Sequence, residues 1–158
     1  MMNNRELSRQ LQVLRNLFDK TKEFTERDME IEIISHWAKY LCVLCAGFLE
    51  NALTEVYVDF CSKTASPNVT SYARASLSRI NNPNTETFYQ VTNSFSKPWG
   101  DNLIIFVEEN GRKEAINAIM SNRHKIAHGK NSDITLVRLR DYFKKAVDVV
   151  DFIEQQCN

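Results

Sequence analysis

Apolar residues recur at alternating intervals of three and four positions in the last part of this chain. Seven residues keep this spacing without interruption: Leu136, Leu139, Phe143, Ala146, Val150, Ile153 and Cys157. The spacing matches one face of a helix with about 3.6 residues per turn. It predicts a long amphipathic helix that packs against other helices, because barely three heptads are too few for a free coiled coil.

Three further stretches show the same helical periodicity. They predict a first helix that ends near Phe24, a longer one from Ile31 that ends before Pro67, and one that runs from Ala115 to His128 and stops at Gly129. The centre of the second stretch is apolar almost all round, which predicts a helix enclosed by its neighbours. The chain holds only four Gly and three Pro, which argues against a many-stranded β-sandwich.

The segment 64–99 has a different character, because it contains all three prolines and many Ser, Thr and Asn residues. We expect short helices at 72–80 and 85–95 within it, and the apolar run 103–107 fits either a helix or a strand. The sequence thus predicts an all-α fold, an up-and-down four-helix bundle with an irregular helical insertion in the middle. A length of 158 residues favours a single domain, 1–158.

The charges of the chain balance, with 20 basic and 20 acidic side chains and a formal net charge of +0. This balance excludes a polycationic nucleic-acid binder but leaves room for a local basic patch. The first residues lack the apolar core of a signal peptide. The most apolar run, 40–49, is well short of the roughly 20 residues that a membrane-spanning helix needs. We therefore expect a cytoplasmic protein without membrane contact.

Two pairs of residues have spacings that occur in metal sites. Cys42 and Cys45 form a C-x-x-C, but they lie inside a long helical pattern without a second pair of ligands, so we expect them to be buried as small hydrophobic residues. His124 and His128 have the i, i+4 spacing of two histidine ligands, but no Glu follows the first and no third ligand is evident. We expect neither a metal nor a cofactor.

The most reactive groups lie in the segment 121–130, SNRHKIAHGK, at the end of the third predicted helix. Arg123, His124 and His128 share roughly one side of its last turns. The negative end of the helix dipole favours protonated imidazole there. Imidazole moves protons near neutral pH, and a guanidinium reaches two phosphate oxygens at once. This combination suits cleavage of RNA by its own ribose 2′-hydroxyl, which requires no metal.

The surrounding charges agree with an anionic ligand. Between Gly111 and Lys130, five cations stand against the single Glu114: Arg112, Lys113, Arg123, Lys125 and Lys130. Such a local excess attracts a polyanion, and Lys125, Lys130 and Asn122 are candidate RNA-binding residues. A plainer interpretation is also open, in which the same Arg and His side chains cap helix carbonyls and aid solubility.

The segment 123–129, RHKIAHG, resembles the R-(N/D/H)-x-x-x-H motif of the HEPN superfamily. It is especially similar to the R-N-x-I-A-H-G form of RiboL-PSP-type and MAE-type bacterial HEPN domains, with His124 at the position usually filled by Asn, Asp or His. The segment 47–53, GFLENAL, resembles the G-x-x-E-x-x-L centre of the second helix of that family. The segment 64–99 is the part that the resemblance assigns least.

This resemblance implies an all-α, homodimeric endoribonuclease in which the motif helices of two protomers face each other. Cleavage would leave a 2′,3′-cyclic phosphate and a 5′-hydroxyl without a metal. Arg123 would bind and polarise the scissile phosphate, His128 would act as general base or acid, and His124 would orient the cleft or hold RNA. Glu50 could reach the motif from the second helix, but we expect it to form a structural salt bridge or to lie on the surface.

The resemblance also implies a biological setting. Many family members are toxins or antiviral effectors that cut RNA and are restrained by a partner, so RNA, a second copy and a cognate antitoxin or regulatory protein are the expected partners. Two alternatives stay open. One is a non-catalytic HEPN module that binds a nucleotide or a partner, since fold does not dictate function. The other is a helical interaction protein with an accidental motif.

Overall fold

The protein folds entirely into helices. The computed structural model describes residues 2–158, apart from the side chain of Thr25, and across them it has seven helices and no strand. The helices are α1 (Arg5–Glu26), α2 (Ile31–Thr64), α3 (Pro67–Leu77), α4 (Thr85–Phe95), α5 (Lys97–Glu108), α6 (Arg112–Ala127) and α7 (Leu136–Gln156). The prediction of an all-α fold is confirmed.

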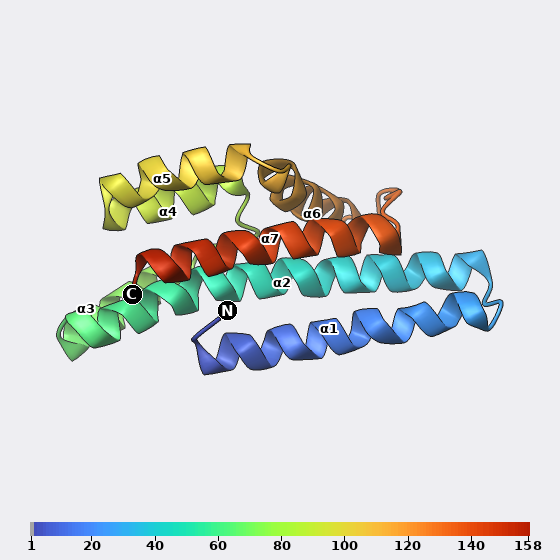
Figure 1. Ribbon diagram of the computed structural model, residues 1–158, viewed down its shortest axis with the longest axis horizontal. Coiled ribbons are helices and arrows are strands. Elements are labelled where there is room, and N and C mark those ends of the chain that lie inside the picture. The colour runs from blue at the N-terminus through green and yellow to red at the C-terminus, as the bar shows by residue number, and fades with distance from the viewer. Residues whose placement is uncertain (1) are drawn as a thin grey trace.

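The four helices predicted from periodicity pack against one another. α2 contacts α1, α6 and α7, and α6 and α7 form an antiparallel pair joined by a short loop (Figure 1). The ring of Phe143 on α7 stacks on Phe18 of α1, with 5.7 Å between centroids, and meets Phe48 of α2 edge-on at 5.5 Å. One aromatic cluster therefore joins three of the four long helices, and such contacts add to the free energy of burying the rings.

The segment expected to be an irregular insertion is helical but more regular than predicted. α4 coincides with the predicted helix at 85–95, α3 begins five residues before the predicted start at 72, and the ambiguous run 103–107 lies within α5. α4 and α5 lie side by side as a hairpin, and α3 packs on the carboxyl end of α2 (Figure 1). The residues taken as loop formers are helix caps, because Ser66 accepts a hydrogen bond from the amide of Val69 and Asn84 accepts one from Thr87.

α2 is the central helix of the core. By length and composition alone it could cross a membrane, but 61% of its most apolar window is buried within the protein, as expected of a core helix in a globular domain. The prediction that neighbours enclose this helix is wrong for its amino-terminal half. There Ile33, Tyr40 and Val43 remain between 38% and 52% exposed, because α1, α6 and α7 together cover only part of the helix circumference.

The two ends of the chain are tied together by a buried carboxylate. Glu154 of α7 is 5% exposed, and its two oxygens accept hydrogen bonds from the amides of Asn3 and Asn4, each at 2.7 Å. These amides precede α1, whose positive dipole end stabilises a negative charge. Glu154 therefore fixes the start of α1 against the end of α7.

Candidate functional site

The motif lies where α6 ends. His128 is the residue that closes the helix, and Gly129 follows in the left-handed conformation, with φ of 65°. The amides of His128, Gly129 and Lys130 donate to the carbonyls of His124, Ile126 and Lys125, respectively. This is the Schellman arrangement, which needs a residue without a Cβ at position 129. Gly129 was expected to stop this helix, and the structure confirms it.

Because backbone amides satisfy these carbonyls, the cationic side chains of the motif are not needed as caps. The imidazole rings of His124 and His128 lie with their centroids 4.4 Å apart, and both residues are exposed. Arg123 is partly buried and makes neither an ion pair nor a side-chain hydrogen bond with any other residue from 2 to 158. The last turns of α6 thus carry two adjacent, exposed imidazoles and, at the position before His124, a partly buried guanidinium without an ion pair among the described residues.

The loop after the motif is fixed to α6 by Asn122, a side chain that the sequence predicts to bind RNA. Asn122 donates from Nδ2 to the carbonyl of Ala118 at 2.9 Å and accepts from Oγ of Ser132 at 2.8 Å. Ser132 is 5% exposed, and its Oγ also accepts from the amide of Ile134. Both polar atoms of the Asn122 amide are therefore engaged in holding the loop that carries Gly129 and Lys130.

The five cations counted between 111 and 130 divide into two groups. Arg112 stacks on the ring of Phe106 and lies 3.9 Å from a Glu109 carboxylate oxygen, and Lys113 forms a 2.6 Å ion pair with Glu108. Arg123, Lys125 and Lys130 form no ion pair with any side chain that the structure describes. The positive charge available to an external anion is therefore concentrated at the motif end of α6.

Two other ionisable residues, both on α2, make contacts away from the motif. Glu50 accepts a 2.7 Å hydrogen bond from the amide of Asn82 and so anchors the loop between α3 and α4, a structural role made through a backbone amide where a salt bridge or a surface position was expected. His36 is exposed on α2, 3.9 Å from a Glu32 carboxylate oxygen. Neither side chain joins the Arg and His cluster of α6.

The C-x-x-C cysteines are buried in the core. Cys42 and Cys45 have no measurable exposure, and the Cys42 thiol donates a long hydrogen bond, 3.5 Å, to the carbonyl of Ile119. Burial raises the pKa of Cys42 to about 12, and burial together with the neighbouring Cys42 raises the pKa of Cys45 well above its usual value. Both remain protonated thiols at neutral pH. Within residues 2–158, no three His, Cys, Asp or Glu side chains gather into a group that could hold a metal ion.

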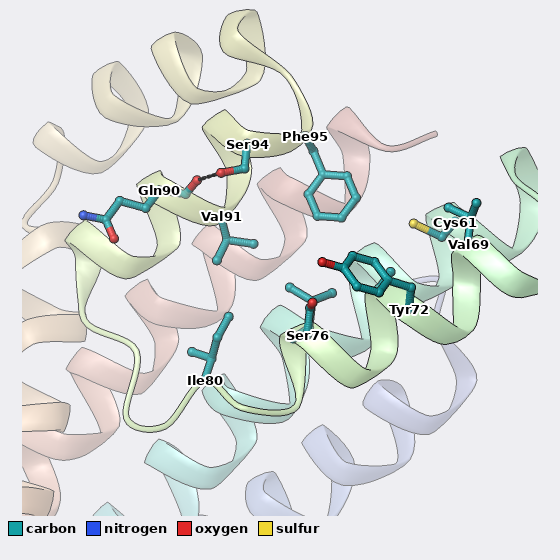
Figure 2. Close-up of a pocket in the computed structure, with 11 residues that line it drawn as sticks. Cys61, Val69, Tyr72, Ser76, Ile80, Gln90, Val91, Ser94 and Phe95 are labelled. Carbon is teal, nitrogen blue, oxygen red and sulfur yellow. Dashed lines mark hydrogen bonds between the residues drawn. The ribbon is translucent and has the colours of Figure 1, made fainter.

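A cavity of about 470 Å³ lies far from the motif. It lies between α3 and α4, at the end of the molecule opposite the α6–α7 loop (Figure 1). Figure 2 shows Tyr72 and Ser76 of α3 facing Val91 and Phe95 of α4 across it. Its lining carries neither a charged side chain nor a histidine. The groups capable of acid–base chemistry therefore lie at the open end of α6 and not in this cavity.

Comparison with known families identifies the relatives of this chain. A model of the family described as RiboL-PSP-HEPN matches residues 5–158. The chain belongs to the RiboL-PSP-HEPN family. None of the curated proteins and none of the solved structures matched it.

The family match covers nearly the whole chain, and not only the segments that carry the motif. The match includes α3, α4 and α5, which the motif alone left unassigned. HEPN domains are all-α, as this one is, and the superfamily contains ribonucleases and nucleotide-binding modules. In this HEPN domain the residues of the R-x-x-x-x-H motif, Arg123 and His128, occupy the exposed end of α6.

Proposed function

We propose that this HEPN domain is a metal-independent endoribonuclease. The observation that carries the proposal is the end of α6, where the His124 and His128 rings lie 4.4 Å apart and the preceding residue, Arg123, forms no ion pair with any side chain that the structure describes. Cleavage begins when a base removes the proton of a ribose 2′-hydroxyl, whose oxygen then attacks the adjacent phosphorus. An acid protonates the departing 5′-oxygen, and the products are a 2′,3′-cyclic phosphate and a 5′-hydroxyl.

Each group has a role that its chemistry fits. The Arg123 guanidinium is permanently charged and stabilises the extra negative charge on the phosphorane-like transition state. His128 exchanges protons near neutral pH as base or acid. His124, next to it, orients the cleft or holds RNA. Lys125 and Lys130 are exposed cations that neutralise neighbouring phosphates.

With His124 assigned to orienting the cleft or holding RNA, one protomer offers a single acid–base group, His128, whereas the reaction needs a base and an acid together. A homodimer with apposed motifs supplies two such groups, so the proposal includes a two-fold assembly in which both copies border one RNA-binding cleft. It also includes the setting that the family suggests, a toxin or antiviral effector with a cognate regulator. Expression of the wild-type chain in a bacterial host should arrest growth, and expression of Arg123→Ala should not.

The direct test is RNA cleavage by the purified chain in EDTA. We expect cyclic-phosphate and 5′-hydroxyl ends from the wild type. Arg123→Ala and His128→Ala should each lower the rate by at least about 100-fold, the scale of a lost transition-state contact or acid–base group. Lys113→Ala, on the same helix but paired with Glu108, is the matched control. Cleavage that survives both motif substitutions rejects the proposal, and tight nucleotide binding without cleavage favours the non-catalytic alternative.

A further inference from the structure

The cavity between α3 and α4 is large enough to hold a ligand. α3 packs on α2 and α4 packs on α5, so the two helices form facing walls, with Tyr72 on one side and Val91 and Phe95 on the other (Figure 2). Cys61 of α2 also lines the space, whose volume is about 470 Å³. Small-molecule sites have volumes of roughly 300–1,000 Å³. This space, the α3–α4 cavity, therefore has room for a single small molecule.

The lining of the α3–α4 cavity is neutral. It is formed largely by aliphatic and aromatic side chains, among them Val69, Leu77, Ile80 and Val91, and none of the residues in it is an Asp, Glu, Lys, Arg or His. A charged group that entered this lining would lose its hydration without gaining a partner of opposite charge. The cavity is therefore suited to an uncharged ligand.

Two hydroxyl groups of α3 are available to orient such a ligand. Tyr72 and Ser76 both line the cavity, and neither hydroxyl has a hydrogen-bond partner within residues 2–158. Figure 2 shows the Tyr72 hydroxyl pointing into the space between the two helices. The Ser94 hydroxyl on α4, in contrast, donates to the carbonyl of Gln90 at 2.7 Å. A few neutral polar groups in an apolar lining are what fixes the orientation of a ligand in small-molecule sites.

One wall of the cavity is an aromatic ring whose position is fixed. Phe95 stacks on Tyr57, with 4.4 Å between centroids and 10° between the ring planes, and Phe60 meets Phe95 edge-on at 6.3 Å. The Tyr57 hydroxyl in turn shares a 2.6 Å hydrogen bond with Thr92. Tyr57 covers one face of the Phe95 ring, while the ring also lines the cavity. Phe95 therefore offers a preformed surface to another planar ring, with little ordering left to occur on binding.

The apolar surface ends at the rim of the cavity. The exposed large hydrophobic residues of α3 and α4 are Val69 and Tyr72, 52% and 75% exposed, and both line the cavity. Next to them on α3, Ser71 is exposed and Arg74 forms a 2.7 Å ion pair with Glu55 of α2. A stable protein interface needs roughly 800 Å² from each partner. An apolar surface confined to one cavity fits a small molecule better than a protein.

We propose that the α3–α4 cavity is a binding site for an uncharged small molecule that carries a planar aromatic ring. The ring of the ligand packs against Phe95 and the aliphatic lining, and the hydroxyls of Tyr72 and Ser76 hydrogen-bond to a neutral polar group on it. The site shares no residue with the α6 motif, so the inference does not depend on the proposed ribonuclease activity.

The test compares two fluorescent dyes that share one ring system. N-phenylnaphthylamine is uncharged, and anilinonaphthalene sulfonate carries the same rings with a negative charge. Titration of the full chain with the neutral dye should show saturable binding at one site per chain. The affinity for the sulfonate dye should be at least about tenfold lower, because its charge finds no partner in the lining.

A matched pair of substitutions on α3 locates the bound dye. Ala73 lines the cavity, whereas Ala75 is exposed and lies outside the lining. Ala73→Trp puts an indole into the space, so it should weaken binding of the neutral dye at least about tenfold, and Ala75→Trp should change it less than about twofold. Far-ultraviolet circular dichroism checks that both variants keep the helical content of the wild type.

A second pair keeps the test decisive if Ala73→Trp does not fold. Ser76→Asp introduces a charge at the lining and should weaken the neutral dye at least about tenfold, while Ser71→Asp, outside the lining, should not. A wild-type chain that shows no saturable binding overturns the inference. So does binding that Ala73→Trp and Ser76→Asp leave as tight as their controls do, because the dye then lies elsewhere. Equal affinities for the two dyes overturn the assignment to an uncharged ligand.

Discussion

The unpaired cations of the motif predict a specific salt dependence of RNA binding. For single-stranded nucleic acid, the logarithm of the binding constant falls with the logarithm of the salt concentration by about 0.7 for each phosphate neutralised. Arg123, Lys125 and Lys130 make no ion pair with the part of the chain that the structure describes, so each is available for one phosphate. One protomer then gives a slope of about −2.1, and a cleft shared by two protomers gives about −4.2.

The two slopes are far enough apart to measure. A slope of about −4.2 lowers the affinity about 300-fold between roughly 50 and 200 mM salt, and one of about −2.1 lowers it only about 20-fold. The assay is fluorescence anisotropy of a labelled single-stranded RNA with His128→Ala, which should bind without cutting. In that background Lys125→Ala should reduce the slope by about 0.7 for a monomer or about 1.4 for the two-fold cleft.

Lys113→Ala provides the control, because the Lys113 ammonium is already paired with Glu108 at 2.6 Å on the same helix. Its slope should stay within about 0.3 of the parent value. A parent slope weaker than about −1, or equal changes in the Lys113 and Lys125 variants, would refute the assignment of the free cations to phosphate binding.

Three further outcomes follow from other contacts. Glu154→Ala leaves two amides at the start of α1 without their acceptor, so it should lower the free energy of unfolding in urea titrations by about 2–4 kcal/mol. Glu154→Gln should have a stability between those of the wild type and Glu154→Ala. A loss below about 0.5 kcal/mol for Glu154→Ala would contradict this. Ser132→Ala frees the loop held by Asn122, so it should lower the cleavage rate about tenfold while the affinity for RNA stays unchanged. Ser132→Thr should restore the rate. Equal cleavage rates of Ser132→Ala and the wild type would contradict this prediction. Burial raises the pKa of Cys42 to about 12 and that of Cys45 as well, so their thiolates are scarce at pH 8. Both cysteines should therefore react with a thiol reagent only once the chain unfolds. Rapid labelling of Cys42 or Cys45 in the native protein would count against this.

Much of the fold follows from the period of apolar residues. The first helix ends at Glu26, two residues beyond the predicted Phe24, and the second ends at Thr64, before Pro67 as predicted. The middle segment was harder because Ser, Asn and Pro are used both in loops and at helix starts. Ser66 and Asn84 cap α3 and α4, so the same composition that suggested irregular chain in fact begins two helices.

The candidate site, like the fold, could be predicted only in part from the sequence. The position of Arg123, His124 and His128 at a helix end, with Gly129 as the stop, could be predicted because helix periodicity and the glycine cap are local signals. The hydrogen bond from Ser132 to Asn122 could not, because it joins a loop to a helix across ten residues. This hydrogen bond also changes what can be expected of Asn122, because its amide nitrogen and its amide oxygen each already hold one partner within the protein.

The proposed two-fold cleft links the assembly of the protein to the binding of its substrate. Apposing the motifs of two copies, as the proposed function requires, brings two sets of motif cations towards one cleft, and their mutual repulsion opposes the dimer. A bound RNA strand relieves that repulsion, so RNA should tighten the dimer. By linkage, the dimer must bind RNA more tightly than the monomer by the same factor. Sedimentation of His128→Ala with and without a short RNA, set beside RNA titrations of the same variant at protein concentrations below and above its dimerisation constant, measures both sides of this equality. Two unequal factors would mean that RNA does not bind between the copies.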